Sequence, residues 1–508
     1  MNHPKAMSIT VTSIMLATAL AYAQPAAPTP PADAPPAAPP AAAPEPPPPP
    51  PPKPATPPPP IANKFQFTIY GFGQLDIIHD NTSVLPEGAG QTVLPRAPMP
   101  GSPAAAVGPA VTPRTTMFGN NSRFGFRLNA PEMGGVKAMT VIEADFMGVV
   151  PNANESGQNN RNLRLRHAYV RMDSDVFDVV AGYTWDVFGG AVVPFLGAGM
   201  AFHGILGEVF HRNPQLRISK TIKSDAVNVE IRAAAVRPVQ AVGEIPDLQG
   251  ALRLTLNNWK TVHSFGSGLP AVDGLTLEVS GMYRFFKLNE FSAAPASFVK
   301  KNGWGASVNA WLPIIPATKE NQANALGVSI EAATGAGIGD MWGINGGAAA
   351  FPNVTDAVAA MPMAMPPVAA VAAVPYVSNI DPGIVTFNRT TGEFMLPKWT
   401  SVVVNLQYRL PFEDGRMVLS SNHSYIMSPN IGDLALAPPA GQPTTGYAAA
   451  NLWKSGIRND VSLSYTFYPA VVVGAMYETI QHKYVTVVND SDKSVRNHRI
   501  HFSILFYF

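Results

Sequence analysis

The chain of 508 residues contains no cysteine, and this absence excludes three kinds of chemistry. Disulfide bonds, thiolate metal ligands and cysteine nucleophiles cannot form. Charge is also scarce, because Asp, Glu, Lys and Arg make up 14% of the residues and the formal net charge is +1. A near-neutral chain offers no overall electrostatic attraction for nucleic acid, so no nucleic-acid partner is predicted.

Uninterrupted apolar runs long enough for a membrane-spanning helix are missing as well. Phe188–Leu206 is uncharged, but it carries five glycines and Pro194. Ala357–Val374 is similarly apolar and contains three prolines. Helix breakers at that density argue against spanning helices, and both stretches are expected to be loops.

The N-terminal residues 1–23 have the pattern of a secretory signal peptide. Lys5 precedes a short apolar run, which is followed by the small-residue site Ala21-Tyr22-Ala23. This pattern predicts export of the chain and cleavage after Ala23.

Residues 24–62 form a proline- and alanine-rich segment, with an unbroken proline run from Pro46 to Pro52. Such a composition cannot build a packed core and favours polyproline II. Two interpretations remain open for it: a semi-rigid periplasmic linker, or a tether that contacts the peptidoglycan of the cell wall.

Residues 63–508 show the two-residue alternation of β-strands. In the last ten residues, RIHFSILFYF, apolar side chains from Ile500 to Phe508 fall on one face. Segments of about ten alternating residues with aromatic ends are typical of transmembrane barrel strands. We predict a closed antiparallel all-β barrel of sixteen strands, near 65–79, 121–130, 136–149, 162–173, 175–186, 214–222, 225–236, 249–258, 275–286, 302–312, 324–335, 398–410, 416–427, 454–467, 471–484 and 496–508.

The predicted connections alternate between short turns and long loops, as expected for periplasmic and external ends. Segment 187–213 is a candidate constriction loop, and 336–397 is a long external loop. Two connections, 259–274 and 313–323, are longer than a periplasmic turn should be. The C-terminal Phe508 closes the last strand and resembles the terminal aromatic signature that the outer-membrane assembly machinery reads.

Strand parity places many charged side chains on the inner face of the predicted barrel. The arginines among them form a candidate basic wall that lines the pore and binds anions: Arg123, Arg127, Arg164, Arg166, Arg217, Arg232 and Arg253. Basic side chains select anions in pores, and the planar guanidinium suits carboxylates. The alternative is that these arginines pair with inward-facing carboxylates and only keep the interior wet. Asp186 and Glu208, in or beside the constriction loop, would face the basic wall.

Four segments, IYGFGQLDIIHD, NSRFGFRL, LRLRHAYVRM and VVAGYTWDVF, resemble the corresponding stretches of bacterial outer-membrane porins of the DcaP-like type. The resemblance runs from about Phe65 to Leu216 and returns at the last strand. It implies a sixteen-stranded trimeric channel with an inward-folded third loop and a preference for small anions such as dicarboxylates. Members of that family begin with a coiled-coil-like helix, which this chain replaces with its proline-rich segment.

The sequence therefore predicts an outer-membrane porin, a passive diffusion channel for small hydrophilic solutes. The alternative is a structural barrel with a plugged or narrow lumen, tethered to the cell wall through the proline-rich segment. Neither an enzyme nor a cofactor or metal site is predicted, because no nucleophile-elbow or phosphate-binding motif is present. The expected partners are outer-membrane lipid, two further copies of the chain and the assembly machinery.

Overall fold

The computed structural model describes most of the chain from Phe65 onward. The described residues are 65–85, 112–148, 161–189, 205–240, 243–264, 270–342, 351, 353–355, 369, 372, 374–378, 380, 381, 383–388, 391–431, 453–468, 470–484 and 494–508. The predicted signal peptide 1–23 and the linker 24–62 lie outside them. Within these ranges, no helix is long and apolar enough to cross a membrane.

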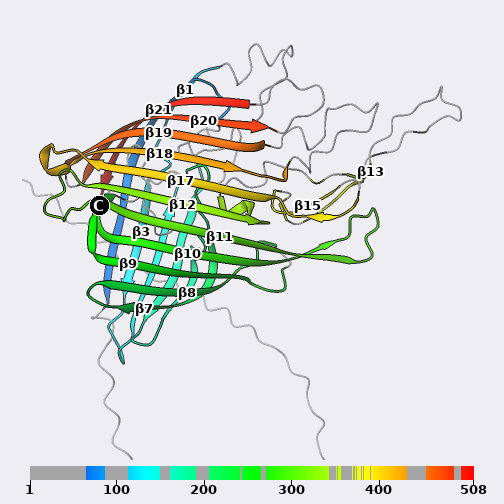
Figure 1. Ribbon diagram of the computed structural model, residues 1–508, viewed down its shortest axis with the longest axis horizontal. Coiled ribbons are helices and arrows are strands. Elements are labelled where there is room, and N and C mark those ends of the chain that lie inside the picture. The colour runs from blue at the N-terminus through cyan, green and yellow to red at the C-terminus, as the bar shows by residue number, and fades with distance from the viewer. Residues whose placement is uncertain are drawn as a thin grey trace, which may run out of the picture. The chain divides into compact units, whose positions relative to one another are not determined.

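Sixteen antiparallel strands form a closed barrel, which confirms the predicted fold class (Figure 1). The main sheet has 17 strands, of which β2 lies in line with β3 along β1 and adds no position to the wall. The strands of the wall are β1 (Gln66–Asp80), β3 (Arg123–Asn129), β4 (Lys137–Asp145), β5 (Arg164–Asp173), β6 (Asp178–Trp185), β7 (Arg212–Lys223), β8 (Val227–Val236), β9 (Asp247–Ser264), β10 (Pro270–Asn289), β11 (Phe298–Ile315), β12 (Leu326–Ala336), β17 (Lys398–Arg409), β18 (Met417–Met427), β19 (Trp453–Tyr468), β20 (Val471–Tyr484) and β21 (Ser494–Tyr507).

The barrel closes between its first and last strands. β1 and β21 pair antiparallel from Phe72↔Tyr507 to Asp80↔Arg499. Gly71 and Phe508 extend this ladder, since each backbone N–H donates to the carbonyl of the other, at 3.0 and 3.1 Å. The last strand thus leaves no open sheet edge, which lipid would not tolerate.

Short elements outside the wall gather in the long connections. The segment expected as an external loop, 336–397, holds two small two-stranded sheets, β13–β14 and β15–β16, which lie beyond one end of the barrel (Figure 1). These elements are β2 (Arg114–Phe118), β13 (Asn353–Thr355), β14 (Val374–Pro375), β15 (Thr386–Phe387), β16 (Phe394–Met395) and the 3₁₀ turns η2 (Gly339–Trp342) and η3 (Glu413–Gly415).

Residues 259–274 were expected to form a long connection, but most of them belong to strands. β9 runs on to Ser264 and β10 starts at Pro270, so the connection between them is short. The hairpin bends at a bulge beside Gly274, and the backbone N–H of Ser264 donates to Gln407 Oε1 on β17 at 3.0 Å. This bond joins strands that are not neighbours in the wall, so the bent hairpin reaches across the inside of this barrel end. The connection 313–323 is also partly strand, because β11 ends at Ile315.

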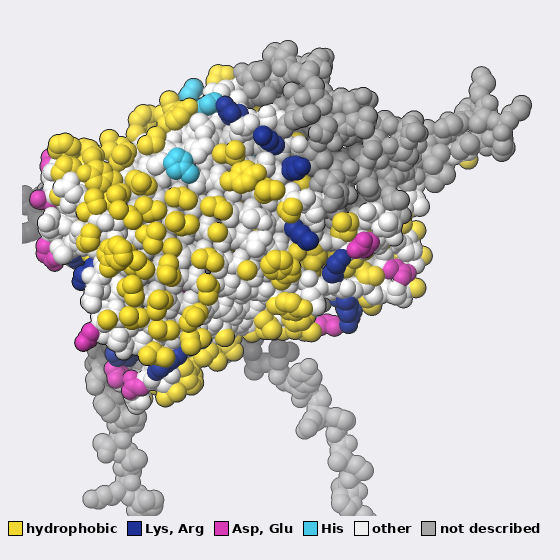
Figure 2. Space-filling view, viewed as in Figure 1, with side chains coloured by type: hydrophobic (Ala, Val, Ile, Leu, Met, Phe, Trp, Pro, Cys, Tyr) yellow, Lys and Arg dark blue, Asp and Glu magenta, His cyan; other side chains and the backbone are white. Residues whose placement is uncertain are grey.

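The two faces of the wall differ in polarity, as the alternation predicts. Outward side chains are apolar and exposed, and Figure 2 shows them spread over the barrel surface. On β21, for example, Phe502 and Phe506 are exposed, whereas His501 and Ser503 are buried on the inner face. An outward apolar band on a closed barrel is the arrangement that a bilayer requires.

An apolar cluster lies inside the barrel and joins opposite walls. It combines inward side chains such as Met282 of β10 and Ile480 of β20 with residues of four long connections, among them Leu85, Leu206 and Trp342. Because these side chains are buried against one another, the connections fold into the half of the lumen nearest the long connections. A second apolar cluster packs the small sheets of 336–397 against β10.

Candidate functional site

The structure places all seven predicted arginines on the inner face of the wall and gives five of them carboxylate partners. The five form two groups, one on β3–β5 and one on β8–β10. Arg127 and Arg217 are the two without an ion pair among the described residues.

The first group joins three arginines to two carboxylates. Arg166 is 3% exposed and contacts Glu143 at 2.7 Å and Asp145 at 2.8 Å. Arg164 holds Asp145 through two hydrogen bonds, of 3.0 and 2.7 Å. Arg123 lies 3.5 Å from Glu143. Three positive charges thus meet two negative charges, which leaves one net positive charge, and each guanidinium already contacts a carboxylate.

A β-bulge explains how β5 presents so many charged groups inward. β4 and β5 pair with one extra residue, Arg166, between Leu165 and His167. Beyond the bulge the parity is reversed, so Tyr169 faces inward and Met172, 41% exposed, faces outward. A bulge re-aims side chains in this way without breaking the ladder. Strict alternation from Arg166 would instead point Tyr169 outward and Met172 inward.

The second group is neutral. Arg232 and Arg253 both bind Glu278, and the Arg253 contact is 2.8 Å. Arg253 also lies 3.3 Å from Glu230. Two arginines thus meet two carboxylates, which leaves no excess positive charge at this part of the wall.

Arg127 and Arg217 lie near Tyr169, which comes from the strand between theirs. Tyr169 is within electrostatic reach of both guanidinium groups and of Arg171. Arg171 binds Asp173 at 2.6 Å, whereas Arg127 is exposed and stacks on the ring of Tyr70 at 5.7 Å. The unpaired positive charge of the predicted basic wall is therefore concentrated here.

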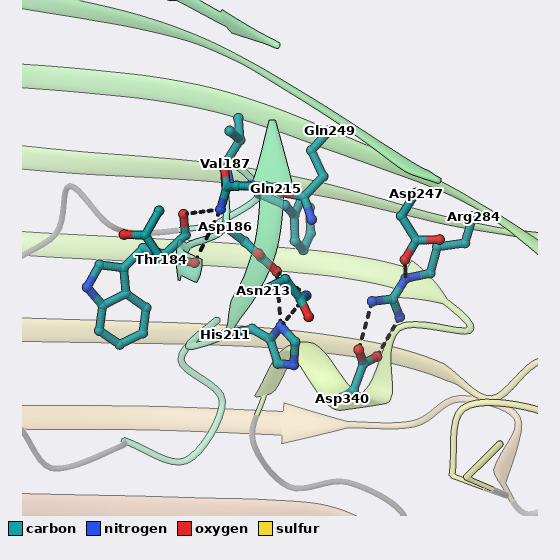
Figure 3. A network of polar contacts seen from close by, with 12 residues as sticks. Thr184, Asp186, Val187, His211, Asn213, Gln215, Asp247, Gln249, Arg284 and Asp340 are labelled. Carbon is teal, nitrogen blue, oxygen red and sulfur yellow. Dashed lines mark hydrogen bonds and ion pairs between the residues drawn. The ribbon is translucent and has the colours of Figure 1, made fainter. Parts of the chain in front are cut away.

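The described parts of 187–213 lie inside the barrel, fixed by hydrogen bonds to the wall (Figure 3). Gln249 Oε1 accepts the backbone N–H groups of Val187 and Phe188 at 2.8 and 2.9 Å. The N–H of Gly189 donates to Ser280 on β10 at 3.0 Å. These bonds turn the chain inward as soon as it leaves β6.

Asp186, predicted to face the basic wall, is buried at the base of this segment. It accepts hydrogen bonds from His211 Nδ1 at 3.0 Å and Asn213 Nδ2 at 3.1 Å (Figure 3). Burial lowers the pKa of His211, but the hydrogen bond and charge of Asp186 outweigh this and raise it. Asp186 therefore ties the two ends of the segment together.

Glu208 faces another carboxyl group. It is 3% exposed, and the backbone N–H of its neighbour Val209 donates to Glu331 Oε1 on β12 at 2.5 Å. Burial and the negative charge of Glu331 raise the pKa of Glu208 well above its usual range, while the N–H of Ile205 and the charge of Arg458 oppose the shift. The raised pKa favours the neutral form of Glu208, which can dock beside Glu331 without repulsion between two carboxylates.

Docking of this segment should weaken as the pH rises. An acid whose pKa is raised by folding stabilises the folded arrangement at low pH, and that contribution is lost as the pH passes its raised pKa. We expect a cysteine introduced by Leu206→Cys into this cysteine-free chain to react faster with a maleimide above that pKa. When Glu208→Gln is added, this increase in the maleimide reaction rate should vanish. Dividing the rate without Glu208→Gln by the rate with it cancels the titration of the thiol itself. Identical pH profiles in both backgrounds would contradict the prediction.

A serine, a histidine and an aspartate also meet on the inner wall, but not as a catalytic relay. His501 Nε2 lies 2.7 Å from Asp76 Oδ1 and 3.0 Å from Ser503 Oγ, and Ser503 also donates to Asp76. A relay needs the acid and the serine on different ring nitrogens. Here both use Nε2, and all three side chains are buried.

For several residues that shape the interior, the sequence showed only that their side chains point inward and gave no indication of their contacts. Arg284 of β10 is fully buried between Asp247 and Asp340 (Figure 3). Arg212 stacks on Trp185 at 4.6 Å. Their roles depend on which strands and loops come together, which alternation does not specify.

Comparison with known proteins places this architecture among solved outer-membrane channels. The outer-membrane channel DcaP of Acinetobacter baumannii is similar with a TM-score of 0.54 and 15% identity, over 88% of this chain and 98% of that one. The fold is that of DcaP. An anion-selective porin from Comamonas acidovorans has a TM-score of 0.44 and 9% identity, over 87% of this chain and 100% of that one. No protein-family model and no curated protein matches the chain.

The DcaP-like resemblance read from the sequence is thus confirmed at the level of the fold. A closed barrel with an even number of strands and an outward apolar band is characteristic of bacterial outer membranes. The chain is an outer-membrane β-barrel.

Proposed function

We propose that the chain is a porin, a passive diffusion channel for small hydrophilic solutes. The observation that carries this proposal is the polar and charged inner wall of a closed, sixteen-stranded barrel. Such a wall can hold water and conduct solutes without binding energy or chemistry. The DcaP fold, found in an outer-membrane channel, supports the same conclusion.

Within this channel, we propose that small anions are favoured by Arg127 and Arg217 rather than by the whole basic wall. The other five predicted arginines each contact a carboxylate, and with their four carboxylate partners they carry one net positive charge. A carboxylate passing Tyr169 would meet one hydroxyl donor and two guanidinium groups that have no ion pair among the described residues. Dicarboxylates are among the anions we expect to be favoured, because a planar guanidinium pairs with a carboxylate.

Reversal potential across a planar bilayer in a salt gradient tests both parts. We expect an open, anion-selective channel, and R127Q/R217Q should lower the chloride-to-potassium permeability ratio at least about threefold, because each charge contributes about 1 kcal/mol at short range in water. The control K398Q/K483Q removes two exposed positive charges from the outward face. An equal loss of selectivity in the control, or none in R127Q/R217Q, would contradict the anion proposal.

The second candidate, a structural barrel with a plugged lumen, is favoured by two observations. The apolar cluster joins opposite walls near the outer end, and the β9–β10 hairpin crosses the other end through Ser264 and Gln407. Absence of conductance from folded protein would support this candidate over the porin. A homotrimer, recognition of Phe508 by the assembly machinery, and contact of 24–62 with peptidoglycan stay predictions.

A further inference from the structure

A row of positively charged side chains crosses the outward face of the barrel at the end that carries the long connections. Figure 2 shows it as a line of Lys and Arg at the edge of the apolar surface. The row comes from the ends of six strands: Lys287 of β10, Lys300 of β11, Lys398 of β17, Lys454 of β19, Lys483 of β20 and Arg496 of β21.

Most of these cations have no ion pair among the described residues. Lys300, Lys398, Lys454 and Lys483 are exposed and make no ion pair with any described residue. Lys287 contacts Glu244 at 2.5 Å. In the same row, Arg496 donates to the neutral Gln481 at 2.6 Å. Among the residues that the structure describes, these six cations therefore have one carboxylate partner, Glu244.

The spacing of the row brings like charges together. Lys287 and Lys300 are directly opposite in the β10–β11 register, and both line a small surface pocket with Gln240 and Glu244. Lys454 lies in a bulge of β19, next to Ser455, and Ser455 pairs with Lys483 of β20. Like charges directly opposite on one face destabilise a sheet. A bound anion would offset this repulsion.

Aromatic side chains fix the level of the row relative to the membrane. Tyr283 and Trp304 are directly paired and face outward, four residues before Lys287 and four after Lys300. Aromatic girdles mark the boundary between hydrocarbon and headgroups. Four residues of strand span about 13 Å, so the cations lie at headgroup level on the external side.

The opposite rim of the barrel mixes both signs. Lys137 lies 3.9 Å from Glu132, and Arg416 lies 3.9 Å from Glu413. Carboxylates accompany lysines of this rim, as Glu320 does Lys260 and Lys319, whereas the row at the other end has Glu244 as its one carboxylate partner among the described residues.

We propose that this row binds the phosphate groups of a lipid in the outer leaflet of the membrane. The acyl chains of such a lipid would cover the apolar surface below the row, while its phosphates would bridge lysines on neighbouring strands. Lysines near an anionic membrane surface add to such binding through their charge. The row would then also fix the depth of the barrel in the bilayer.

Lipid A retention by the purified full chain tests the proposal. Protein incubated with lipid A in detergent is repurified, and bound lipid is counted by native mass spectrometry. Phosphatidylcholine, which is zwitterionic with a net charge of zero, is the reference. We expect K300Q/K398Q/K454Q/K483Q to retain about tenfold less lipid A than the unmodified protein. Phosphatidylcholine retention should not change.

The matched control K137Q/K223Q/K260Q/K319Q removes four exposed lysines from the opposite rim. It should retain lipid A like the unmodified protein. Equal retention by both quadruple variants, or an equal loss in both, would overturn the proposal. Heat-modifiable gel migration checks that each barrel is folded. If the first variant does not assemble, K483Q alone should still lower retention about twofold, and unchanged retention would again overturn the proposal.

Discussion

Replacing Gly71 by alanine should prevent stable closure of the barrel. A Cβ at this position would lie 2.3 Å from the backbone oxygen of Arg123 and 2.8 Å from the ring of Phe508. The first contact is with backbone and cannot be relieved by a side-chain rotation. We expect a destabilisation of about 3 kcal/mol, because the pairing of β1 with β3 or with β21 must shift to make room.

Gly73 provides the matched control on the same strand and the same outward face. A Cβ there would meet nothing within 4 Å. We expect Gly73→Ala to give a folded, heat-modifiable band at the yield of the unmodified protein, and Gly71→Ala to lose most of it. If the two variants assemble equally well, the close contact of β1 with Phe508 is not required for closure.

Replacing Arg284 by methionine should have a similarly large effect. Its guanidinium binds Asp247 at 2.9 Å and Asp340 at 2.5 and 2.7 Å, and donates to the carbonyl of Gly337 at 3.1 Å. All of these groups are buried in the protein interior. Without Arg284, two carboxylates remain buried without their cation, which costs about 3–5 kcal/mol. The melting temperature followed by circular dichroism in detergent measures this loss.

Two variants separate the buried charge from the loss of the side chain itself. Arg284→Met/Asp247→Asn/Asp340→Asn removes the carboxylate charges too, and it should recover most of the stability, because buried ion groups can often be replaced by neutral ones at little cost. Arg416→Met removes an exposed arginine, 3.9 Å from Glu413, and should change stability by less than about 1 kcal/mol. Equal melting temperatures for Arg284→Met and Arg416→Met would contradict the prediction, because they would show that the buried ion pairs of Arg284 do not contribute measurably to stability.

Arg284 also shows how the interior is organised. Asp340 belongs to η2 in the long connection after β12, so the ion pairs fix that connection to the wall at β9 and β10. The adjacent residues Met341 and Trp342 then join the apolar cluster with Leu206. Loss of Arg284 should therefore loosen the interior cluster as well as lower the melting temperature.

The sequence by itself determined the strands, their number and their faces. The last predicted strand but one, 471–484, coincides with β20, and every predicted strand overlaps one strand of the wall. The reason is physical: each residue of such a strand faces either lipid or the interior, so the alternation must appear in the local sequence. The expected long connection 259–274 was wrong, because a hairpin that extends past the lipid has no outward apolar face by which to recognise it. Ten residues, 316–325, still separate β11 from β12.

Only the tertiary structure decided which charges meet. Inward parity identified Arg127 and Arg166 alike, yet Arg166 is buried against Glu143 and Asp145, while Arg127 has no ion pair with a described residue. That difference depends on the register between strands and on the bulge at Arg166. It also depends on connections that enter the lumen from far along the chain, as Glu208 does beside Glu331. Ion pairing acts over a few ångströms between strands, whereas alternation records only the direction in which each side chain points.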